Sequence, residues 1–312
     1  MTGATPPHPR VPLRALLPLV VTMLFWGSAF TASSLAVGHV GHQVAAALRY
    51  GVAAIVMVAV LAVTGRGAPP LSRRAWGWML VAGALGIAIY NGAFFAGLSL
   101  APAIDGSSIM PVMSPVFTAA LALVVRRERP TRMRLGALVA GLAGAAIFLL
   151  STTVDAAYPN RVLGDLLFLS AAFIWAVYTL MARRLMGLAD PFRVTTWAMV
   201  FGGLILAVWA LPELTTTDWA AQPPDLWLEV VYLAVLPTAL GYALYNRGVR
   251  DVGPTTASIM MFLVPITGAG MAVLLLGQHL EPGQLLGALT MAAGALLAIL
   301  STGAGTRAPK VA

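Results

Sequence analysis

The chain has 312 residues, of which 59% are hydrophobic and 10% are charged, and its net charge is +8. Soluble domains carry about 25% charged residues, so most of this protein's surface must face something other than water. With no cysteine and a single lysine, Lys310, the sequence excludes disulfides, thiolate metal sites and a P-loop nucleotide site, and it predicts no metal, cofactor or catalytic residue.

Ten apolar runs follow one another, each close to the roughly 20 residues that cross a membrane. They cover residues 14–35, 43–63, 76–98, 104–125, 134–151, 163–182, 194–212, 227–246, 255–277 and 283–301. No connection is long enough to form a separate soluble domain. The sequence therefore predicts an all-α integral membrane protein of ten transmembrane helices in a lipid bilayer, with tails at residues 1–13 and 303–312.

The basic residues are confined to alternate connections. Seventeen of the 19 bases lie in the two tails and in every second connection, and the other two are Arg161 and Arg49. Because cytoplasmic loops are enriched in Lys and Arg, we expect both termini to be cytoplasmic. This topology explains the positive net charge without a nucleic-acid partner.

The sequence repeats itself at an interval of 149 to 151 residues. The matched elements are Ser108-Ile109-Met110 with Ser258-Ile259-Met260, Pro115 with Pro265, and Trp26 with Trp175. Each half holds five spans, an odd number, so the halves must have opposite orientations. Inverted repeats are typical of secondary transporters, whose substrate site lies at the repeat interface near mid-membrane. We predict two five-helix repeats, residues 14–152 and 163–302.

Several short motifs occur in an order that resembles a known family. They are Phe25-Trp26-Gly27-Ser28, Asn91, Pro102, Ser107-Ser108, Pro115-Val116-Phe117-Thr118, Arg127-Glu128-Arg129 and Trp175-Ala176-Val177-Tyr178. With them the chain resembles the drug/metabolite transporter superfamily, and within it the EamA-type ten-helix branch, from about residue 14 to residue 302. The resemblance implies export of small metabolites, often amino acids, by alternating access. Exporters of aromatic and neutral amino acids are similar in length and layout.

One position departs from the family pattern. The acidic residue after the fourth helix is present as Glu128, but its counterpart after the ninth is Gln278. A role that requires a carboxylate at that second position is in doubt, unless Glu281 replaces it.

Neutral polar and aromatic side chains are expected to line the substrate cavity, because almost no ionisable residue lies within the spans. Tryptophan and tyrosine suit this role, since each combines an apolar face with one hydrogen-bonding tip. The candidate cavity residues are Trp26, Ser28, Arg49, Tyr90, Asn91, Ser107, Ser108, Trp175, Tyr178, Tyr242, Tyr245 and Ser258. Plain packing is the alternative for the two tryptophans, and a hydrogen bond to a neighbouring helix is the alternative for Asn91.

Arg49 is the one charged residue well inside a span. It lies six residues into the second run, about 9 Å deep at 1.5 Å per residue. Either its side chain snorkels to the outer interface or pairs with a neighbouring carbonyl, or it attracts the carboxylate of a substrate.

Serines and prolines mark helix starts and interruptions. Ser107, Ser108 and Ser258 lie at the starts of the fourth and ninth runs. Either the free backbone N–H groups at these helix starts bind an anion, or the small side chains only allow neighbouring helices to pack closely. The candidate gating residues, hinges or static kinks, are Pro111, Pro115, Pro237 and Pro265. Small residues four apart in the fifth and tenth runs indicate close packing within the protomer or in a dimer.

These features predict a secondary transporter in a cell membrane, taken to be a bacterial inner membrane, that exports aromatic or neutral amino acids and related metabolites. Facilitated diffusion is favoured over proton coupling through Glu229 or Asp165, because no titratable group lies near mid-span. Efflux of toxic compounds and uptake are the alternatives within transport. The sequence shows neither the clustered acid, base and nucleophile of an enzyme nor the polar ring of a channel.

Overall fold

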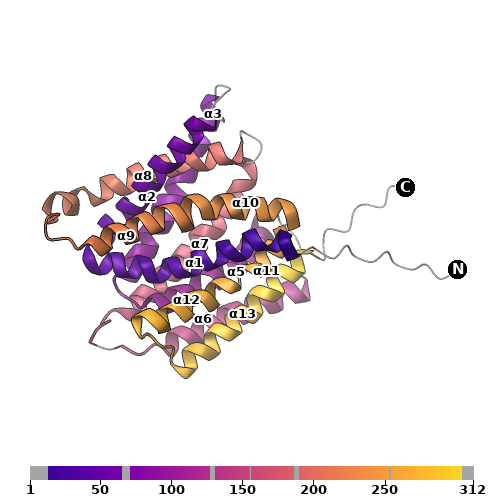
Figure 1. The fold of residues 1–312 in the computed structure, drawn as a ribbon. Coiled ribbons are helices and arrows are strands. Elements are labelled where there is room, and N and C mark those ends of the chain that lie inside the picture. The colour runs from indigo at the N-terminus through magenta and orange to yellow at the C-terminus, as the bar shows by residue number, and fades with distance from the viewer. Residues whose placement is uncertain are drawn as a thin grey trace, which may run out of the picture.

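The computed structural model describes residues 13–64, 71–126, 131–154, 156–185, 190–252 and 254–303, which form helices joined by short turns (Figure 1). Within these ranges, nine helical stretches are long and apolar enough to cross a membrane. The remaining predicted span consists of two shorter helices. The prediction of an all-α membrane protein is confirmed.

The first half runs through α1 (Leu13–His39), α2 (His42–Val63), α3 (Arg73–Gly83), η1 (Ala84–Ile89), α4 (Tyr90–Leu98), α5 (Ala103–Arg126) and α6 (Arg132–Leu150). The second half runs through α7 (Arg161–Leu185), α8 (Pro191–Thr216), α9 (Pro224–Leu233), η2 (Ala234–Leu240), α10 (Gly241–Val252), α11 (Pro254–Met260), α12 (Leu263–Leu276) and α13 (Pro282–Gly303). The η segments are wider π-helical turns in the middle of the third and eighth spans.

Local signals in the sequence set the ends of several helices. The side chain of Ser72 accepts a hydrogen bond from the N–H of Ala75, and that of Thr131 accepts one from Arg134. Each bond satisfies a backbone donor that the first helical turn leaves free. At the other end of a span, Gly277 has a φ of 64° and ends α12, a conformation that glycine adopts without strain.

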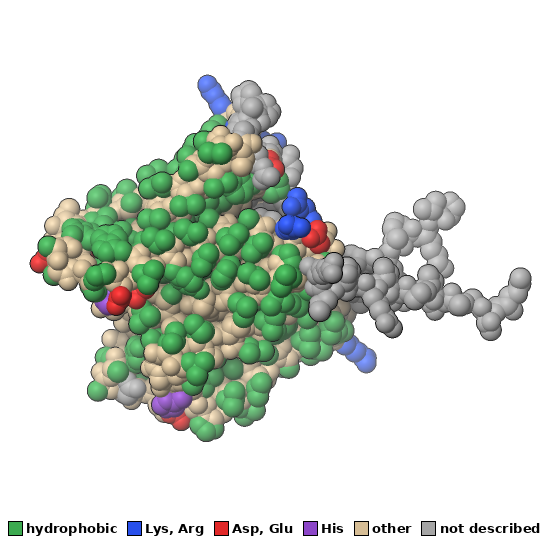
Figure 2. Space-filling view, in the orientation of Figure 1, with side chains coloured by type: hydrophobic (Ala, Val, Ile, Leu, Met, Phe, Trp, Pro, Cys, Tyr) green, Lys and Arg blue, Asp and Glu red, His purple; other side chains and the backbone are tan. Residues whose placement is uncertain are grey.

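The two ends of the bundle differ in charge. Helix α1 begins and α13 ends on the same side, at the right of Figure 1, which we name the near end; the opposite side is the far end. Figure 2 shows blue basic side chains at the near end and the visible histidines at the far end, with a broad hydrophobic surface between them. Large apolar side chains such as Leu150 (88% exposed) and Leu274 (80%) lie on the surface of the bundle. Such exposure fits contact with lipid chains.

The ninth span is interrupted, which corrects the prediction of one continuous helix over residues 255–277. The break falls at Met261 and Phe262, between α11 and α12. Pro265 explains it, because proline lacks the N–H that would bond to the carbonyl of Met261 and its ring clashes with that carbonyl. Val264 donates to Met261 instead, at 3.0 Å.

Two groups of three spans form the centre of the bundle. Helices α4 and α5 pack against α7, and helices α10 and α12 pack against α1. We name these the α4–α5–α7 group and the α1–α10–α12 group. Each group contains one helix from the other half of the sequence, so the two repeats interlock. Helix α2 packs against α8, and α6 packs against α13.

Glycines bring α6 and α13 into backbone contact. A Cβ atom on Gly287 would lie 2.6 Å from the backbone nitrogen of Phe148, and one on Gly294 would lie 2.5 Å from that of Gly141. Gly144 likewise faces the backbone of Gly287 and Met291. The small residues of the fifth and tenth spans therefore pack against each other within the protomer, which accounts for the pattern without a dimer.

We predict that Gly287→Val lowers the free energy of unfolding by about 1–3 kcal/mol, because the added side chain overpacks the α6–α13 contact. Gly136→Val is the matched control, since nothing lies within 4 Å of a Cβ at that position. Thermal unfolding in detergent would measure both. Equal midpoints for the two variants would show that the glycine contact is not tight.

Candidate functional site

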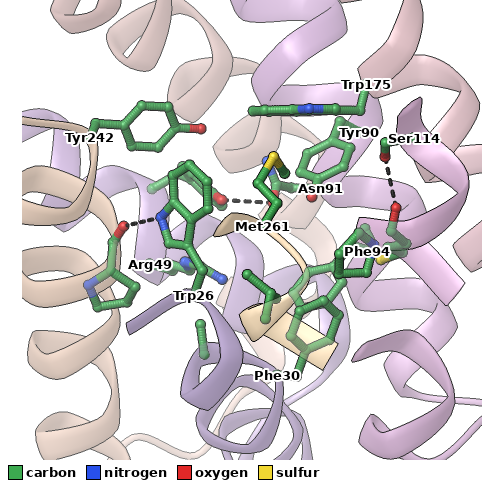
Figure 3. A pocket seen from close by; sticks show the side chains of 16 residues that line it. Trp26, Phe30, Arg49, Tyr90, Asn91, Phe94, Ser114, Trp175, Tyr242 and Met261 are labelled. Atoms are coloured by element: carbon green, nitrogen blue, oxygen red, sulfur yellow. Dashed lines mark hydrogen bonds between the residues drawn. The ribbon is translucent and has the colours of Figure 1, made fainter. Parts of the chain in front are cut away.

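A cavity of about 90 Å³ lies between the two groups of spans (Figure 3). By the same measure one water needs about 10–15 Å³, so there is room for several water-sized groups. The lining residues are Trp26, Ala29, Phe30, Arg49, Tyr50, Tyr90, Asn91, Phe94, Met110, Pro111, Ser114, Trp175, Pro237, Tyr242, Met261 and Val264. Of the described α-helices, α3, α6, α8, α9, α11 and α13 contribute none of these residues.

Two tryptophan–tyrosine pairs face the cavity, one in each group. Trp26 in α1 lies 5.8 Å from Tyr242 in α10, edge to face, and Trp175 in α7 lies 5.1 Å from Tyr90 in α4, measured between ring centroids. The tryptophans are repeat equivalents, and each tyrosine closely follows a π-helical turn. Each pair joins a residue of the first half to one of the second. The cavity thus carries the same aromatic arrangement twice, in opposite orientations.

Both π-helical turns carry carbonyls that receive hydrogen bonds from side chains. The indole Nε1 of Trp26 donates to the carbonyl of Pro237 at 3.0 Å, and the amide of Asn91 donates to that of Ile87 at 2.8 Å. Pro237 and Ile87 are 150 residues apart in the repeat. Thr238 donates to the carbonyl of Leu233 at 2.8 Å, which is the group that the missing N–H of Pro237 would have bonded.

Asn91 both faces the cavity and bonds to a neighbouring helix. Its side-chain oxygen accepts a hydrogen bond of 2.7 Å from the hydroxyl of Tyr50 in α2, while its amide caps the π-helical turn η1. The hydrogen bond to a neighbouring helix, one of the two interpretations from the sequence, is present, and contact with a substrate stays a prediction. Because both polar atoms are hydrogen-bonded, burial of the amide carries little free-energy penalty, and its orientation is fixed.

Arg49 lies in the cavity wall and is only 7% exposed. Its guanidinium donates to Ser33 at 3.2 Å and, with longer geometry, to Thr238 at 3.4 Å, and it lies 5.1 Å from the ring centroid of Tyr50. All three neighbours are uncharged. The side chain bridges from α2 to η2 instead of extending to the membrane surface, so the snorkelling alternative does not describe this structure.

The cavity is closed on its far side. The rings of Phe30 in α1 and Phe94 in α4 meet edge to face at 5.3 Å, and both are buried. Closer to the far end, the side chain of Gln278 accepts a hydrogen bond of 3.0 Å from the backbone of Ile104. These contacts all join the α4–α5–α7 group to the α1–α10–α12 group, on the far side of the tryptophans.

The sequence profile of the EamA-like transporter family matches the chain twice, over residues 13–150 and 162–300. The chain belongs to the EamA-like transporter family. The two matches confirm the two-repeat architecture. It is 27% identical over 277 residues to the uncharacterized transporter YyaM of Bacillus subtilis, covering 88% of this chain and 90% of that protein.

A second relative is described by the kind of compound it exports. The chain is 26% identical over 286 residues to a protein of Streptantibioticus cattleyicolor named a probable terminal-alkyne amino-acid exporter, covering 91% of this chain and 93% of that one. A solved crystal structure shares the fold, with a TM-score of 0.61, 21% identity and coverage of 95% of this chain and 99% of that one. Family and relatives are transporters, not enzymes, and the protein is a multi-pass membrane protein.

Three predicted cavity residues lie elsewhere in this EamA-like transporter. Tyr245 and Tyr178 do not line the cavity but contact the rings of Trp26 (5.0 Å) and Trp175 (5.4 Å). Ser28 lies on a different face of α1, where its hydroxyl bonds to Tyr232 beside an open apolar groove. The residue type and the span of these three residues suggest a cavity position, but neither determines the direction of a side chain.

The serines of the fourth span are also corrected. Helix α5 begins at Ala103, within one residue of the predicted start of the run, so Ser107 and Ser108 lie beyond its first turn and bond to the carbonyl of Ile104. Ser107 faces Gly268 of α12 in close packing. The packing alternative therefore describes them. The side chain of Ser258, and Glu128 as a whole, lie outside the described residues.

The four prolines divide in two. Pro111 and Pro237 line the cavity, whereas Pro115 and Pro265 do not. Pro111 and Pro115 lie inside an unbroken α5. Pro265, the repeat counterpart of Pro115, follows the break between α11 and α12. Their action as hinges stays a prediction.

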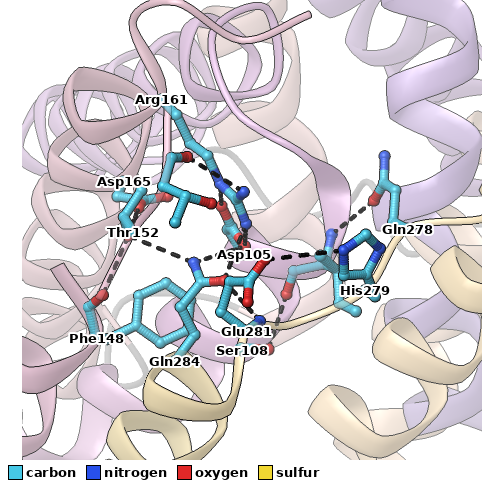
Figure 4. A network of polar contacts seen from close by, with 12 residues as sticks. Asp105, Ser108, Phe148, Thr152, Arg161, Asp165, Gln278, His279, Glu281 and Gln284 are labelled. Atoms are coloured by element: carbon cyan, nitrogen blue, oxygen red, sulfur yellow. Dashed lines mark hydrogen bonds and ion pairs between the residues drawn. The ribbon is translucent and has the colours of Figure 1, made fainter. Parts of the chain in front are cut away.

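Sequence reasoning missed a buried polar network at the far end, drawn in Figure 4. Arg161 in α7 donates to both carboxylate oxygens of Asp105 in α5, at 2.7 and 2.9 Å, and to Gln284 in α13 at 3.1 Å. Thr152 donates to Asp165 at 2.9 Å. Asp105, in the first turn of α5, and Arg161, the first residue of α7, are 0% and 5% exposed. The signal was available, because Arg161 is a lone base among the far-end connections.

We predict that Asp105→Asn lowers the free energy of unfolding by about 3–5 kcal/mol, because the buried guanidinium of Arg161 then lacks its carboxylate. The double variant Asp105→Asn/Arg161→Met should recover much of this loss, since no uncompensated charge remains at the pair. Chemical or thermal unfolding of purified protein in detergent would compare them. If Asp105→Asn unfolds like the native protein, the pair is not essential to the fold.

Proposed function

We propose that this protein exports neutral, chiefly aromatic, amino acids and related small metabolites by alternating access. The substrate would occupy the cavity between the two groups of spans, near mid-membrane, where inverted repeats place it. Opening and closing would come from relative movement of the α4–α5–α7 and α1–α10–α12 groups.

The two tryptophan–tyrosine pairs carry this proposal. Four aromatic rings surround a cavity that offers few polar contacts. An apolar or aromatic side chain of the substrate would therefore be transferred from water into contact with these rings. The tryptophan of each group is held in place by its tyrosine neighbours, and Trp26 also by its bond to Pro237. Rigid aromatic walls with a few polar groups are typical of small-molecule sites.

A relative supports the substrate class. The similarity to a protein named a probable terminal-alkyne amino-acid exporter extends over 91% of this chain. At 26% identity it supports amino acids as a class and leaves the individual compound to experiment.

We propose facilitated diffusion because none of the described residues that line the cavity carries a carboxylate. Apart from tyrosines, Arg49 is the ionisable residue among the lining side chains. Asp165 and Glu229, which a proton-coupled carrier would use, lie outside the lining. Asp165 belongs to the far-end network instead.

The direction of the chain in the membrane completes the proposal. The basic near end would face the cytoplasm, in a bacterial inner membrane, with residues 14–152 and 163–302 as the two repeats. The contact between Phe30 and Phe94 then closes the cavity toward the outside. Such a state would receive substrate from the cytoplasm.

Counterflow in proteoliposomes tests the proposal without an imposed ion gradient. Vesicles loaded with unlabelled phenylalanine should accumulate labelled phenylalanine from outside, saturably. Trp26→Ala and Trp175→Ala should each lower the apparent affinity by about tenfold, the equivalent of about 1.4 kcal/mol of lost aromatic contact. Trp227→Ala is the matched control, because Trp227 is 45% exposed and pairs with Trp219 away from the cavity.

The outcomes separate the alternatives. Accumulation that needs no gradient supports facilitated exchange, whereas accumulation only with a proton gradient would replace it with proton coupling. If no amino acid exchanges, the amino acid assignment fails, and cationic drugs and other metabolites become the compounds to test. Equal loss in all three tryptophan variants would argue against a special role for the cavity pair.

A further inference from the structure

Among the residues that the structure describes, no acidic side chain pairs with the guanidinium of Arg49. Its two hydrogen-bond partners are the hydroxyls of Ser33 and Thr238. A guanidinium has five N–H donors. These two bonds leave several donors for a ligand in the cavity, whose wall Arg49 forms beside Trp26 (Figure 3).

The same protein shows how it neutralises a buried arginine when the role is structural. Arg161, 5% exposed, is paired with Asp105 through two short parallel bonds. Arg49, 7% exposed, has no such carboxylate. A buried charge is costly unless it is paired, so a guanidinium left with neutral partners beside a cavity is suited to receive an anion.

The charge also breaks the symmetry of the cavity. The tryptophans at positions 26 and 175 are repeated, but the residue 150 positions after Arg49 is Met199. Met199 is fully buried and does not line the cavity. The positive charge therefore lies on one side of an otherwise two-fold aromatic site, next to α2 and η2. A bound anion would be held in one orientation, with its apolar part between the tryptophan–tyrosine pairs.

We propose that Arg49 binds the carboxylate of the substrate, so that the transported compounds are carboxylates with an apolar or aromatic part and cations that lack a carboxylate are rejected. This inference rests on the proposed function in taking the cavity as the substrate site. Thr238 positions the guanidinium, because it accepts from Arg49 while donating to the carbonyl of Leu233. A planar guanidinium can meet a carboxylate with two parallel bonds, which lysine cannot do.

Competition in the counterflow assay separates the two charged groups of an amino acid. 3-Phenylpropionate keeps the carboxylate of phenylalanine and lacks its amine, whereas 2-phenylethylamine keeps the amine and lacks the carboxylate. With the native protein, 3-phenylpropionate should inhibit phenylalanine exchange, and 2-phenylethylamine should be a weaker inhibitor by more than about tenfold. If the amine inhibits as well as the carboxylate, the proposal is wrong.

Variants connect this preference to one residue. Arg49→Gln should lower the apparent affinity for phenylalanine by about tenfold or more and leave the inhibition by 2-phenylethylamine unchanged. Arg49→Lys should restore part of the preference for the carboxylate because it keeps the charge. Arg250→Gln, an exposed arginine of α10, is the control and should behave like the native protein. An equal loss for both compounds in Arg49→Gln would assign Arg49 to structure alone.

A binding measurement keeps the test independent of transport. 3-Phenylpropionate should raise the unfolding temperature of the detergent-solubilised native protein and of Arg250→Gln, but not that of Arg49→Gln. If no amino acid exchanges and this arginine-dependent shift remains, the proposed substrates are wrong and the carboxylate site stands. If 3-phenylpropionate shifts the native protein and Arg49→Gln alike, or shifts neither, the carboxylate site is refuted.

Discussion

Every backbone N–H and C=O in the hydrocarbon region must find a partner inside the protein, and the irregular parts of this structure follow from that requirement. The helices depart from regular geometry at η1, at η2 and at the break between α11 and α12. Residues of all three, or next to them, line the cavity. The carbonyls that regular helices would have used are bonded by Trp26, Asn91 and Thr238. Two of these three side chains, Trp26 and Asn91, also line the cavity.

Span count, repeat and overall class were predictable from the sequence, because each depends on a property summed over many residues. About 20 apolar residues per span and a repeat of 149 to 151 residues remain visible even when single positions deviate. The matching positions of Trp26 and Trp175 followed from the repeat, and their distance from both ends of the spans favoured a cavity. Here the sequence pattern and the structure agree, because mid-membrane depth is encoded in position along the chain.

Features that depend on side-chain direction or on pairing between distant segments were not predictable. Ser28 and Trp26 are two residues apart in one helix, which puts them on different faces, and the hydropathy of the run does not distinguish these faces. Asp105 and Arg161 lie at or next to predicted span ends, where charged side chains are usually exposed to water. Their two charges cancel in the folded protein, and a count of charges along the chain contains no information on that pairing.

Each group contains one helix from the other half of the sequence, and this arrangement has a consequence for biogenesis. The bond between Trp26 and the carbonyl of Pro237 joins residues 211 positions apart, and the helices with the most extensive contact to α1 are α10 and α12. During synthesis α1 enters the bilayer long before these partners have been made. Until the second half has been inserted, the polar and aromatic face of α1 contacts lipids or helices other than its final partners. Neither half can complete a cavity wall alone, so a truncated chain exposes unfinished surfaces to membrane quality control.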